Sequence, residues 1–226
     1  APAFVAAYNS RGLVRAERGA YADAIADYER AIALDATNAF LFNNRGIARR
    51  AAKDLEGAVS DFSKAIALDG TELMFVQNRG ATHLERRQYA EARADFTTLV
   101  DRGHSIAAAH FGRATAHLEL SALAEAVADF SRAIELDPRR SDALFGRARA
   151  YFGRSEFEQA AADFGRVVAL EPKHAAAHLH RGITLLRLGK KSEAAADFRR
   201  CLTLSPREKE RIAAEKNLAT LVEHAP

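Results

Sequence analysis

The stretch Ala133-Ile134-Glu135-Leu136-Asp137-Pro138 recurs in this chain at a constant interval. Similar phrases end at Pro172 and Pro206, each 34 residues after the one before. Two earlier phrases, at residues 31–35 and 65–69, fit the same interval without the proline. Self-similarity at one fixed period is typical of proteins that stack copies of a single structural unit, so this phrase predicts a repeat architecture.

The register divides the chain into six units without insertion, at 5–38, 39–72, 73–106, 107–140, 141–174 and 175–208. One position is always alanine: Ala24, Ala58, Ala92, Ala126, Ala160 and Ala194. Another is always aromatic: Tyr28, Phe62, Phe96, Phe130, Phe164 and Phe198. A third holds only glycine or alanine: Gly12, Gly46, Gly80, Ala114, Ala148 and Gly182.

Each unit therefore predicts two amphipathic helices, because small residues let the two backbones approach while the aromatic ring fills the space between units. The turn between the two helices is expected at Gly19, Lys53, Arg87, Ser121, Ser155 and Gly189.

This arrangement resembles the tetratricopeptide repeat family, whose units carry a small residue early, alanine and then an aromatic later, and proline at the end. The resemblance covers residues 5–208. It implies an all-α fold, a right-handed superhelical solenoid of antiparallel helical hairpins whose first helices line a concave groove. The chain departs from the family pattern in having no tryptophan, and in carrying other residues where the first helix usually has tyrosine: Arg15, Arg49, His83 and His117.

A solenoid of hairpins leaves the apolar face of its last unit uncovered. Residues 209–226 contain a stretch with helical periodicity, in which charged side chains lie opposite Ala214, Leu218, Leu221 and Val222. This segment is expected to be a C-terminal capping helix.

Charge and composition exclude several classes of protein. The formal net charge is +3 with both signs interspersed, so no patch predicts binding to nucleic acid or to a membrane surface. No apolar run reaches the roughly 18 residues of a membrane span. The single cysteine, Cys201, excludes an intramolecular disulfide and leaves the compartment open: cytoplasmic, or exported if an upstream signal peptide was removed. The excess of alanine, and of arginine over lysine, favours a bacterial source.

Every unit has an arginine in its first predicted helix and an aspartate in its second. The arginines are Arg11, Arg45, Arg79, Arg113, Arg147 and Arg181, and the aspartates are Asp27, Asp61, Asp95, Asp129, Asp163 and Asp197. The two positions are equidistant from the turn, so they lie at the same height in an antiparallel hairpin and are expected to form ion pairs. The alternative is an arginine ladder that binds an acidic partner.

First-helix positions that packing does not use are expected to face the groove. One column reads Asn9, Asn43, Gln77, Phe111, Phe145 and Leu179, and the positions beside it include Asn44, Asn78, Arg149, Phe152 and His180. Amides can donate to and accept from an extended peptide backbone, and a concave apolar patch often marks a partner site. The alternative is that the phenylalanines only pack against neighbouring second helices, or that the chain's own terminus fills the groove. Some repeats of the resembled family clamp acidic C-terminal tails with lysine and arginine at these positions. Here the same positions hold Asn9, Leu13, Asn44, Met74 and Asn78, so no such clamp is expected.

No motif predicts catalysis, a metal site or a cofactor. There is no Gly-x-Ser-x-Gly elbow and no glycine-rich phosphate loop after a strand. His174, His178 and His180 are close in sequence but lack an acidic ligand at helical spacing, so packing or solvated histidines are expected.

The sequence therefore predicts a scaffold or adaptor, not an enzyme, that binds a peptide or helix of a partner protein along the groove. Phe111, Phe145 and Phe152 are the expected anchors. Two alternatives stay open: a regulatory or substrate-recruiting arm of a larger enzyme or complex, and a structural protein that self-assembles as a homo-oligomer.

Overall fold

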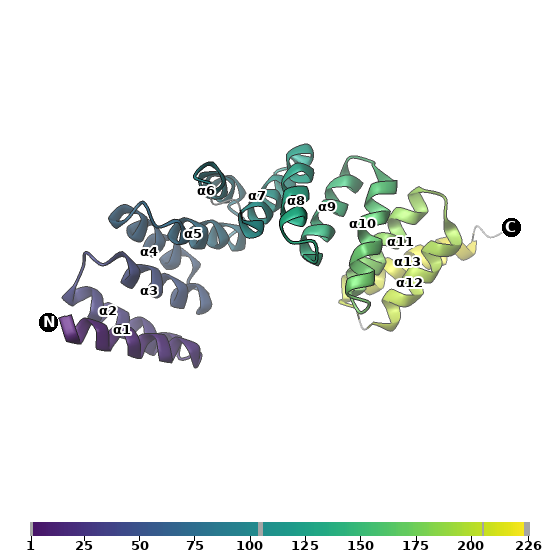
Figure 1. The fold of residues 1–226 in the computed structure, drawn as a ribbon. Helices are drawn as coiled ribbons and strands as arrows, with labels where there is room; N and C mark the ends of the chain where they lie inside the picture. Colours follow the sequence, from purple (N-terminus) through teal and green to yellow (C-terminus); the bar gives the residue numbers. More distant parts are fainter. Residues whose placement is uncertain (1, 104–105, 205, 224–226) are drawn as a thin grey trace. The chain divides into compact units, whose positions relative to one another are not determined.

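A computed structural model describes residues 2–103, 106–204 and 206–223, and within these ranges it contains helices and no strand (Figure 1). The chain divides into two compact units, Ala1–Ala116 and His117–Pro226. The helices of the first unit are α1 (Pro2–Glu17), α2 (Tyr21–Leu34), α3 (Ala39–Ala51), α4 (Leu55–Leu68), α5 (Leu73–Glu85) and α6 (Tyr89–Asp101). Helix α7 (Ala107–Glu119) begins in the first unit and ends in the second. The second unit continues with α8 (Leu123–Leu136), α9 (Ser141–Gly153), α10 (Phe157–Leu170), α11 (Ala175–Arg187), α12 (Lys191–Thr203) and α13 (Glu208–Glu223).

Within each unit the helices pair into hairpins, and consecutive hairpins pack on one another. In the first unit α1 contacts α2, α3 contacts α4 and α5 contacts α6, while α2 and α4 each contact the first helix of the following hairpin. In the second unit α9 pairs with α10 and α11 with α12, with α8 against α9 and α10 against α11. The all-α hairpin architecture is thus confirmed, whereas the boundaries of the six sequence units stay a prediction.

The turn inside each hairpin requires a residue in the left-handed region. Positive φ angles are found at Gly19, Lys53, Arg87, Ser121, Ser155 and Gly189, between 58° and 76°. After each of them the chain closes a Schellman motif: the N–H of Ala20, for example, donates to the carbonyl of Arg15 over 2.9 Å. This geometry ends the first helix and reverses the chain, even where the left-handed residue is not glycine.

Within each unit the core lies between the two helices of a hairpin and between adjacent hairpins. The aromatic of each second helix is almost fully buried, and a Cβ added at Gly12 would lie 2.7 Å from the ring of Tyr28. The small first-helix residue is therefore a packing requirement.

At the C-terminal end α13 packs on α12 and α11. Ala214 is fully buried in a cluster with Phe198 and Cys201, and Leu218 and Leu221 pack against that cluster. We propose that α13 is the capping helix; the side chain of Val222 and residues 224–226 lie outside the described residues. None of the described helices combines the length and the apolar character needed to cross a membrane.

Candidate partner-binding surface

Arginine–aspartate pairs join the two helices of a hairpin. In α9 and α10, Arg147 donates from Nε and Nη2 to the two carboxylate oxygens of Asp163, over 2.7 and 2.9 Å. Four other hairpins show the same two-pronged contact: Arg11–Asp27, Arg45–Asp61, Arg79–Asp95 and Arg181–Asp197. The aspartates are buried, so each guanidinium compensates a desolvated carboxylate. Arg113 and Asp129 lie in different units, and their pairing stays a prediction.

A second cationic or imidazole side chain approaches the same carboxylate. It comes from the first-helix position where the resembled family has tyrosine, and the contacts are Arg15–Asp27, Arg49–Asp61, His83–Asp95 and His117–Asp129. In the first hairpin, the hydrogen bond from Arg11, helped by the charge of Arg15, holds the pKa of Asp27 below its ordinary value. The departure from the family pattern therefore supplies further partners to a buried acid.

The same arginines also connect successive hairpins. Arg79 Nη1 donates to the hydroxyl of Ser63 over 3.2 Å, and Arg147 Nη1 donates to the hydroxyl of Ser131 over 3.0 Å. Each serine belongs to the second helix of the preceding hairpin. One guanidinium thus holds the partner helix of its own hairpin and the helix that covers it.

Four asparagines of the first helices form a chain of hydrogen bonds across α1, α3 and α5. Asn78 donates to Asn43 over 2.8 Å, Asn43 donates to Asn44 over 3.4 Å, and Asn44 donates to Asn9 over 3.0 Å. The amide orientations follow from this network. Asn43 is only 2% exposed, so its side chain lies too deep for direct contact with a partner. Asn9, Asn44 and Asn78 are half-buried and reach the surface.

An open pocket of about 340 Å³ lies beside this chain of amides. Its lining comes from α1, α2 and α3, and consists of Leu13, Ala16, Glu17, Tyr21, Tyr28, Asn44, Ile47, Ala48 and Ala51. Leu13 is 42% exposed and Ile47 is 43% exposed, although both are large and apolar. Burial raises the pKa of Tyr28 to about 12, so this phenol stays neutral.

Sequence reasoning did not count Leu13 and Ile47 among the groove residues. The sequence did contain a signal for them. Leu13 and Ile47 are 34 residues apart, so they occupy the same register position on two successive first helices, and large aliphatic residues recur there without a role in packing.

In the second unit Phe145 belongs to an aromatic cluster. Its ring meets Phe164 edge-on at 5.4 Å, stacks on His174 at 5.3 Å, and meets His180 edge-on at 5.4 Å. Burial lowers the pKa of His180, and the positive charge of Arg149 acts in the same direction. Phe145 is half-buried, so one part of its ring is used in packing and the rest faces outward.

Phe152 and Arg149 lie farther along α9. Phe152 is half-buried and meets Phe157 edge-on at 5.4 Å. Arg149 is exposed, and its Nη2 lies 3.2 Å from a carboxylate oxygen of Glu119. Both residues therefore present part of their side chains at the surface of the second unit.

The remaining predicted groove residues differ in depth. Leu179 is only 5% exposed and packs in the cluster of Phe198 and Cys201, so it serves the core. Gln77 and Phe111 are half-buried in the first unit. The shared register position therefore does not give a shared exposure.

The histidines of α11 have structural contacts. His178 is buried, with Nδ1 at 2.9 Å from Asp197 and Nε2 at 3.3 Å from the carbonyl of Pro172. His174 accepts a hydrogen bond from the backbone N–H of Ala177 and so caps α11. Among the described residues, no group of histidine, cysteine and acidic side chains is arranged to hold a metal ion.

Comparison with known proteins gives the family. A tetratricopeptide repeat model matches residues 78–143 and 145–208, and a TPR repeat model matches residues 12–51. No curated protein matches the sequence.

Solved structures with the same fold are distant in sequence. YrrB, a TPR protein with an unusual peptide-binding site, is 21% identical with a TM-score of 0.70, over 84% of this chain and 97% of its own. PilW, a type IV pilus biogenesis factor, is 17% identical with a TM-score of 0.80, over 96% and 98%. PilF of Pseudomonas aeruginosa is 17% identical with a TM-score of 0.77, over 97% and 98%.

At these identities the structural likeness concerns the fold alone. The fold is typically a non-catalytic module for protein–protein interaction. The repeat model covers more than half of the sequence, and this chain therefore belongs to the tetratricopeptide repeat family.

Proposed function

We propose that this protein is a scaffold that binds a segment of a partner protein on the surface of its first helices, with the main contact at the pocket between α1 and α3. The observation that carries the proposal is the exposure of Leu13 and Ile47 side by side in that pocket. Large apolar side chains gathered in an open hollow are a common feature of partner sites. An apolar side chain of the partner would bury both aliphatic residues.

The amide chain supports the same surface. Asn44 lines the pocket and is held by Asn43 and Asn9. Because each amide is oriented by the next, the side-chain NH₂ group of Asn9 and the side-chain carbonyl oxygen of Asn78, at the two ends of the chain, are fixed in direction. Such ends can accept from and donate to the backbone of an extended peptide without selecting its sequence.

The second unit offers a different chemistry. Phe145 is held rigidly by Phe164 and two histidines, and Phe152 is half-buried nearby on α9. Rigid aromatic side chains lose little conformational entropy when a partner covers them, so they are efficient anchors. We propose that the second unit supplies aromatic contacts through Phe145 and Phe152, while the first unit supplies aliphatic contacts and amides.

The experiment is selection of displayed random peptides on the purified chain, followed by binding measurements with the selected peptides. Leu13→Glu and Ile47→Glu place a charge in the pocket, and we expect each to weaken binding about tenfold or more, because an unpaired charge would be buried by the apolar anchor. Val14→Glu is the matched control, since Val14 is equally exposed on α1 but does not line the pocket.

Peptides that share an apolar residue, bind the wild type and are lost in the two pocket variants would support the proposal. Peptides that bind the pocket variants as tightly as the wild type would refute it. Circular dichroism at the helix bands confirms that each variant is folded.

A further inference from the structure

Among the described residues that line the pocket between α1 and α3, Glu17 alone is charged. It is the last residue of α1, and it lies one helical turn beyond Leu13 on the same face of the helix. The corresponding positions on α3, each 34 residues later, are held by Ile47 and Ala51. Because Glu17 is exposed and the alanine opposite it is small, a side chain that enters the pocket can reach this carboxylate.

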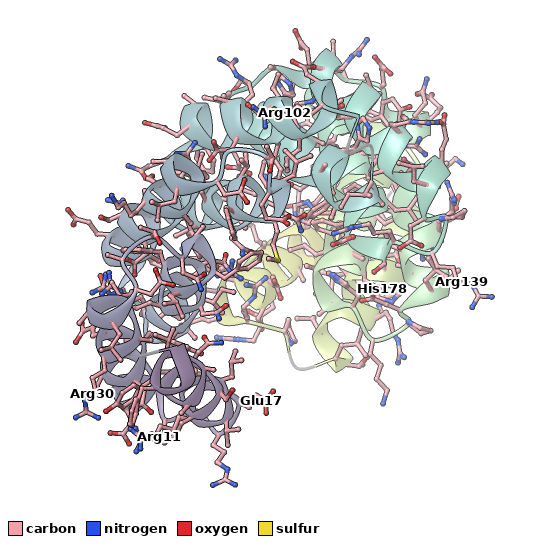
Figure 2. The ribbon with its side chains drawn as sticks, turned by 60° about the vertical axis from the view of Figure 1, so that its left-hand side comes forward. Arg11, Glu17, Arg30, Arg102, Arg139 and His178 are labelled. Atoms are coloured by element: carbon pink, nitrogen blue, oxygen red, sulfur yellow. The ribbon has the colours of Figure 1, made fainter. Side chains whose placement is uncertain are left out.

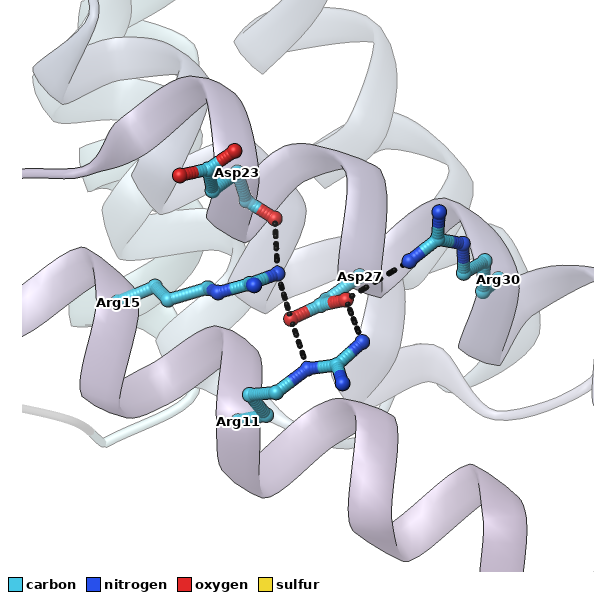
Figure 3. A network of polar contacts seen from close by, with 5 residues as sticks. All are labelled: Arg11, Arg15, Asp23, Asp27 and Arg30. Atoms are coloured by element: carbon cyan, nitrogen blue, oxygen red, sulfur yellow. Dashed lines mark hydrogen bonds and ion pairs between the residues drawn. The ribbon is translucent and has the colours of Figure 1, made fainter.

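The arginines of the first hairpin that form ion pairs are engaged away from Glu17. Figure 2 shows Arg11 and Arg30 on one side of this hairpin and Glu17 on the other. Three arginines surround the carboxylate of Asp27 instead (Figure 3). Arg11 and Arg15 each lie 2.6 Å from it, and Arg30 lies 3.4 Å from it. In the part of the chain that the structure describes, Glu17 makes no ion pair.

A later first helix shows what such a glutamate binds when the chain itself supplies the partner. Glu119 ends α7 at the register position of Glu17, and Arg149 of the following first helix, α9, lies 3.2 Å from its carboxylate. In the first unit the position of Arg149 is held by Ile47, on the following first helix, α3. The first unit thus keeps the carboxylate and replaces the cation by one wall of an apolar pocket.

The place of Glu17 on its helix gives a second reason to expect a cation. A carboxylate at the C-terminal end of a helix lies beside the negative end of the helix dipole, which is unfavourable. Glu17 ends α1, so its charge does not stabilise the helix that carries it. Burial, the charge of Asp27 and the charge of Glu17 all raise the pKa of Tyr28, to about 12, so the field of Glu17 reaches the floor of the pocket while the phenol stays neutral. A basic side chain bound here would offset this charge.

We propose that the pocket selects partner segments that carry a lysine or an arginine close to their apolar anchor, an inference that rests on the function proposed above. The apolar side chain would lie between Leu13 and Ile47. The basic side chain would pack its methylene groups on Ala51 and place its charge at Glu17. Leu13 and Glu17 are about 6 Å apart along α1, since a helix rises about 1.5 Å per residue. An extended chain advances about 3.3 Å per residue, so the basic residue is expected one or two positions from the anchor.

The test repeats the selection of displayed random peptides on the wild type, on Glu17→Gln and on Glu17→Lys. With the wild type we expect lysine and arginine to be enriched about twofold to fivefold within two positions of the shared apolar residue. The enrichment should disappear on Glu17→Gln, and Glu17→Lys should select glutamate and aspartate at these positions, because the charge beside the pocket is then reversed. Asp23→Asn is the matched control, since Asp23 is also exposed and acidic in the first hairpin but does not line the pocket.

A double-mutant cycle then measures the charge pair itself. A peptide selected on the wild type is compared, by fluorescence anisotropy, with the same peptide carrying norleucine in place of lysine or citrulline in place of arginine. We expect the neutral peptide to bind the wild type about twofold to fivefold more weakly at about 0.1 M salt, and the difference to be lost at about 1 M salt and in Glu17→Gln. Glutamine keeps the size of the side chain and removes a charge that the helix end disfavours, so circular dichroism should show this variant to be folded and at least as stable as the wild type.

Two results would overturn this inference and leave the proposed function intact. One is a set of peptides that share an apolar residue and are lost in Leu13→Glu and Ile47→Glu, yet show no excess of basic residues. The other is a preference for basic residues that persists in Glu17→Gln, because the cation would then bind elsewhere. A wild type that selects no peptide would overturn the inference and the proposed function together. So would a chain of twice the expected mass that Ile47→Glu makes monomeric, because a second copy would then fill the pocket.

Discussion

Gly165 stands where two other hairpins have a serine that accepts a hydrogen bond from an arginine of the next hairpin. Ser63 and Ser131 accept a hydrogen bond from the arginine of the next hairpin, and Gly165 occupies the same register position before Arg181. A Cβ built on Gly165 would meet only Nη1 of Arg181, at 3.9 Å. A serine at this position therefore has room, and its hydroxyl would reach hydrogen-bonding distance of a guanidinium nitrogen.

The magnitude follows from two terms. Replacing glycine by alanine inside a helix stabilises it by about 1 kcal/mol, and serine recovers about half of that. A hydrogen bond to the partly buried guanidinium of Arg181 adds about 0.5 to 1.5 kcal/mol. We therefore expect Gly165→Ala to raise the free energy of unfolding by about 1 kcal/mol and Gly165→Ser by about 1 to 2 kcal/mol.

Urea unfolding followed by circular dichroism measures both variants. Hydrogen exchange of the α10 and α11 amides checks that the gain is local, because repeat proteins need not unfold in one step. The reverse exchange, Ser131→Ala, loses the hydrogen bond to Arg147 but gains about 0.5 kcal/mol of helix propensity, so we expect a net loss of about 0 to 1 kcal/mol. If Gly165→Ser falls below Gly165→Ala by the full propensity difference, Arg181 gains nothing from the hydroxyl and the reasoning is refuted.

Three further predictions concern stability. Asp163→Ala leaves Arg147 partly buried without its carboxylate and should lower the free energy of unfolding by about 2 to 4 kcal/mol in urea titrations, and a loss below 1 kcal/mol would show that solvent replaces the pair. Ser155→Gly removes the strain of a positive φ of 62° and should raise the free energy of unfolding by about 0.5 to 1 kcal/mol, and Gly19→Ser is the control that should lower it. His180 has its pKa lowered in the folded chain, so the unfolded chain binds more protons below the ordinary value of 6.5. Its contribution is therefore present above pH 6.5 and is lost as the pH falls through the folded pKa, and unfolding of His180→Gln should depend less on pH across that range. Equal pH dependence in wild type and variant would contradict this sign.

The hairpin architecture could be predicted because a few register positions carry most of the packing. Gly12 and Tyr28 illustrate this, since the ring leaves no room for a Cβ. The turn positions were also predictable, although Ser155 and Lys53 adopt a left-handed conformation that their residue types do not announce.

The candidate surface was harder to predict because one register position does not have one environment. Asn9 and Asn43 share a column, yet Asn43 is sealed beneath the amide of Asn78. Leu179 shares it too and belongs to the core next to α13. A column identifies the side of a helix, whereas depth depends on the size and hydrogen bonding of neighbours that only coordinates reveal.

The asparagine chain has a mechanical consequence for the first unit. Any bending that spreads α1, α3 and α5 apart must stretch the bonds from Asn78 to Asn43 and from Asn44 to Asn9, which span successive hairpins. Because Asn43 and Asn44 are adjacent and bonded to each other, strain applied at one end is transmitted to the other. The amides thus act as a tether along the first helices of three hairpins, and they resist any motion that would spread these helices apart.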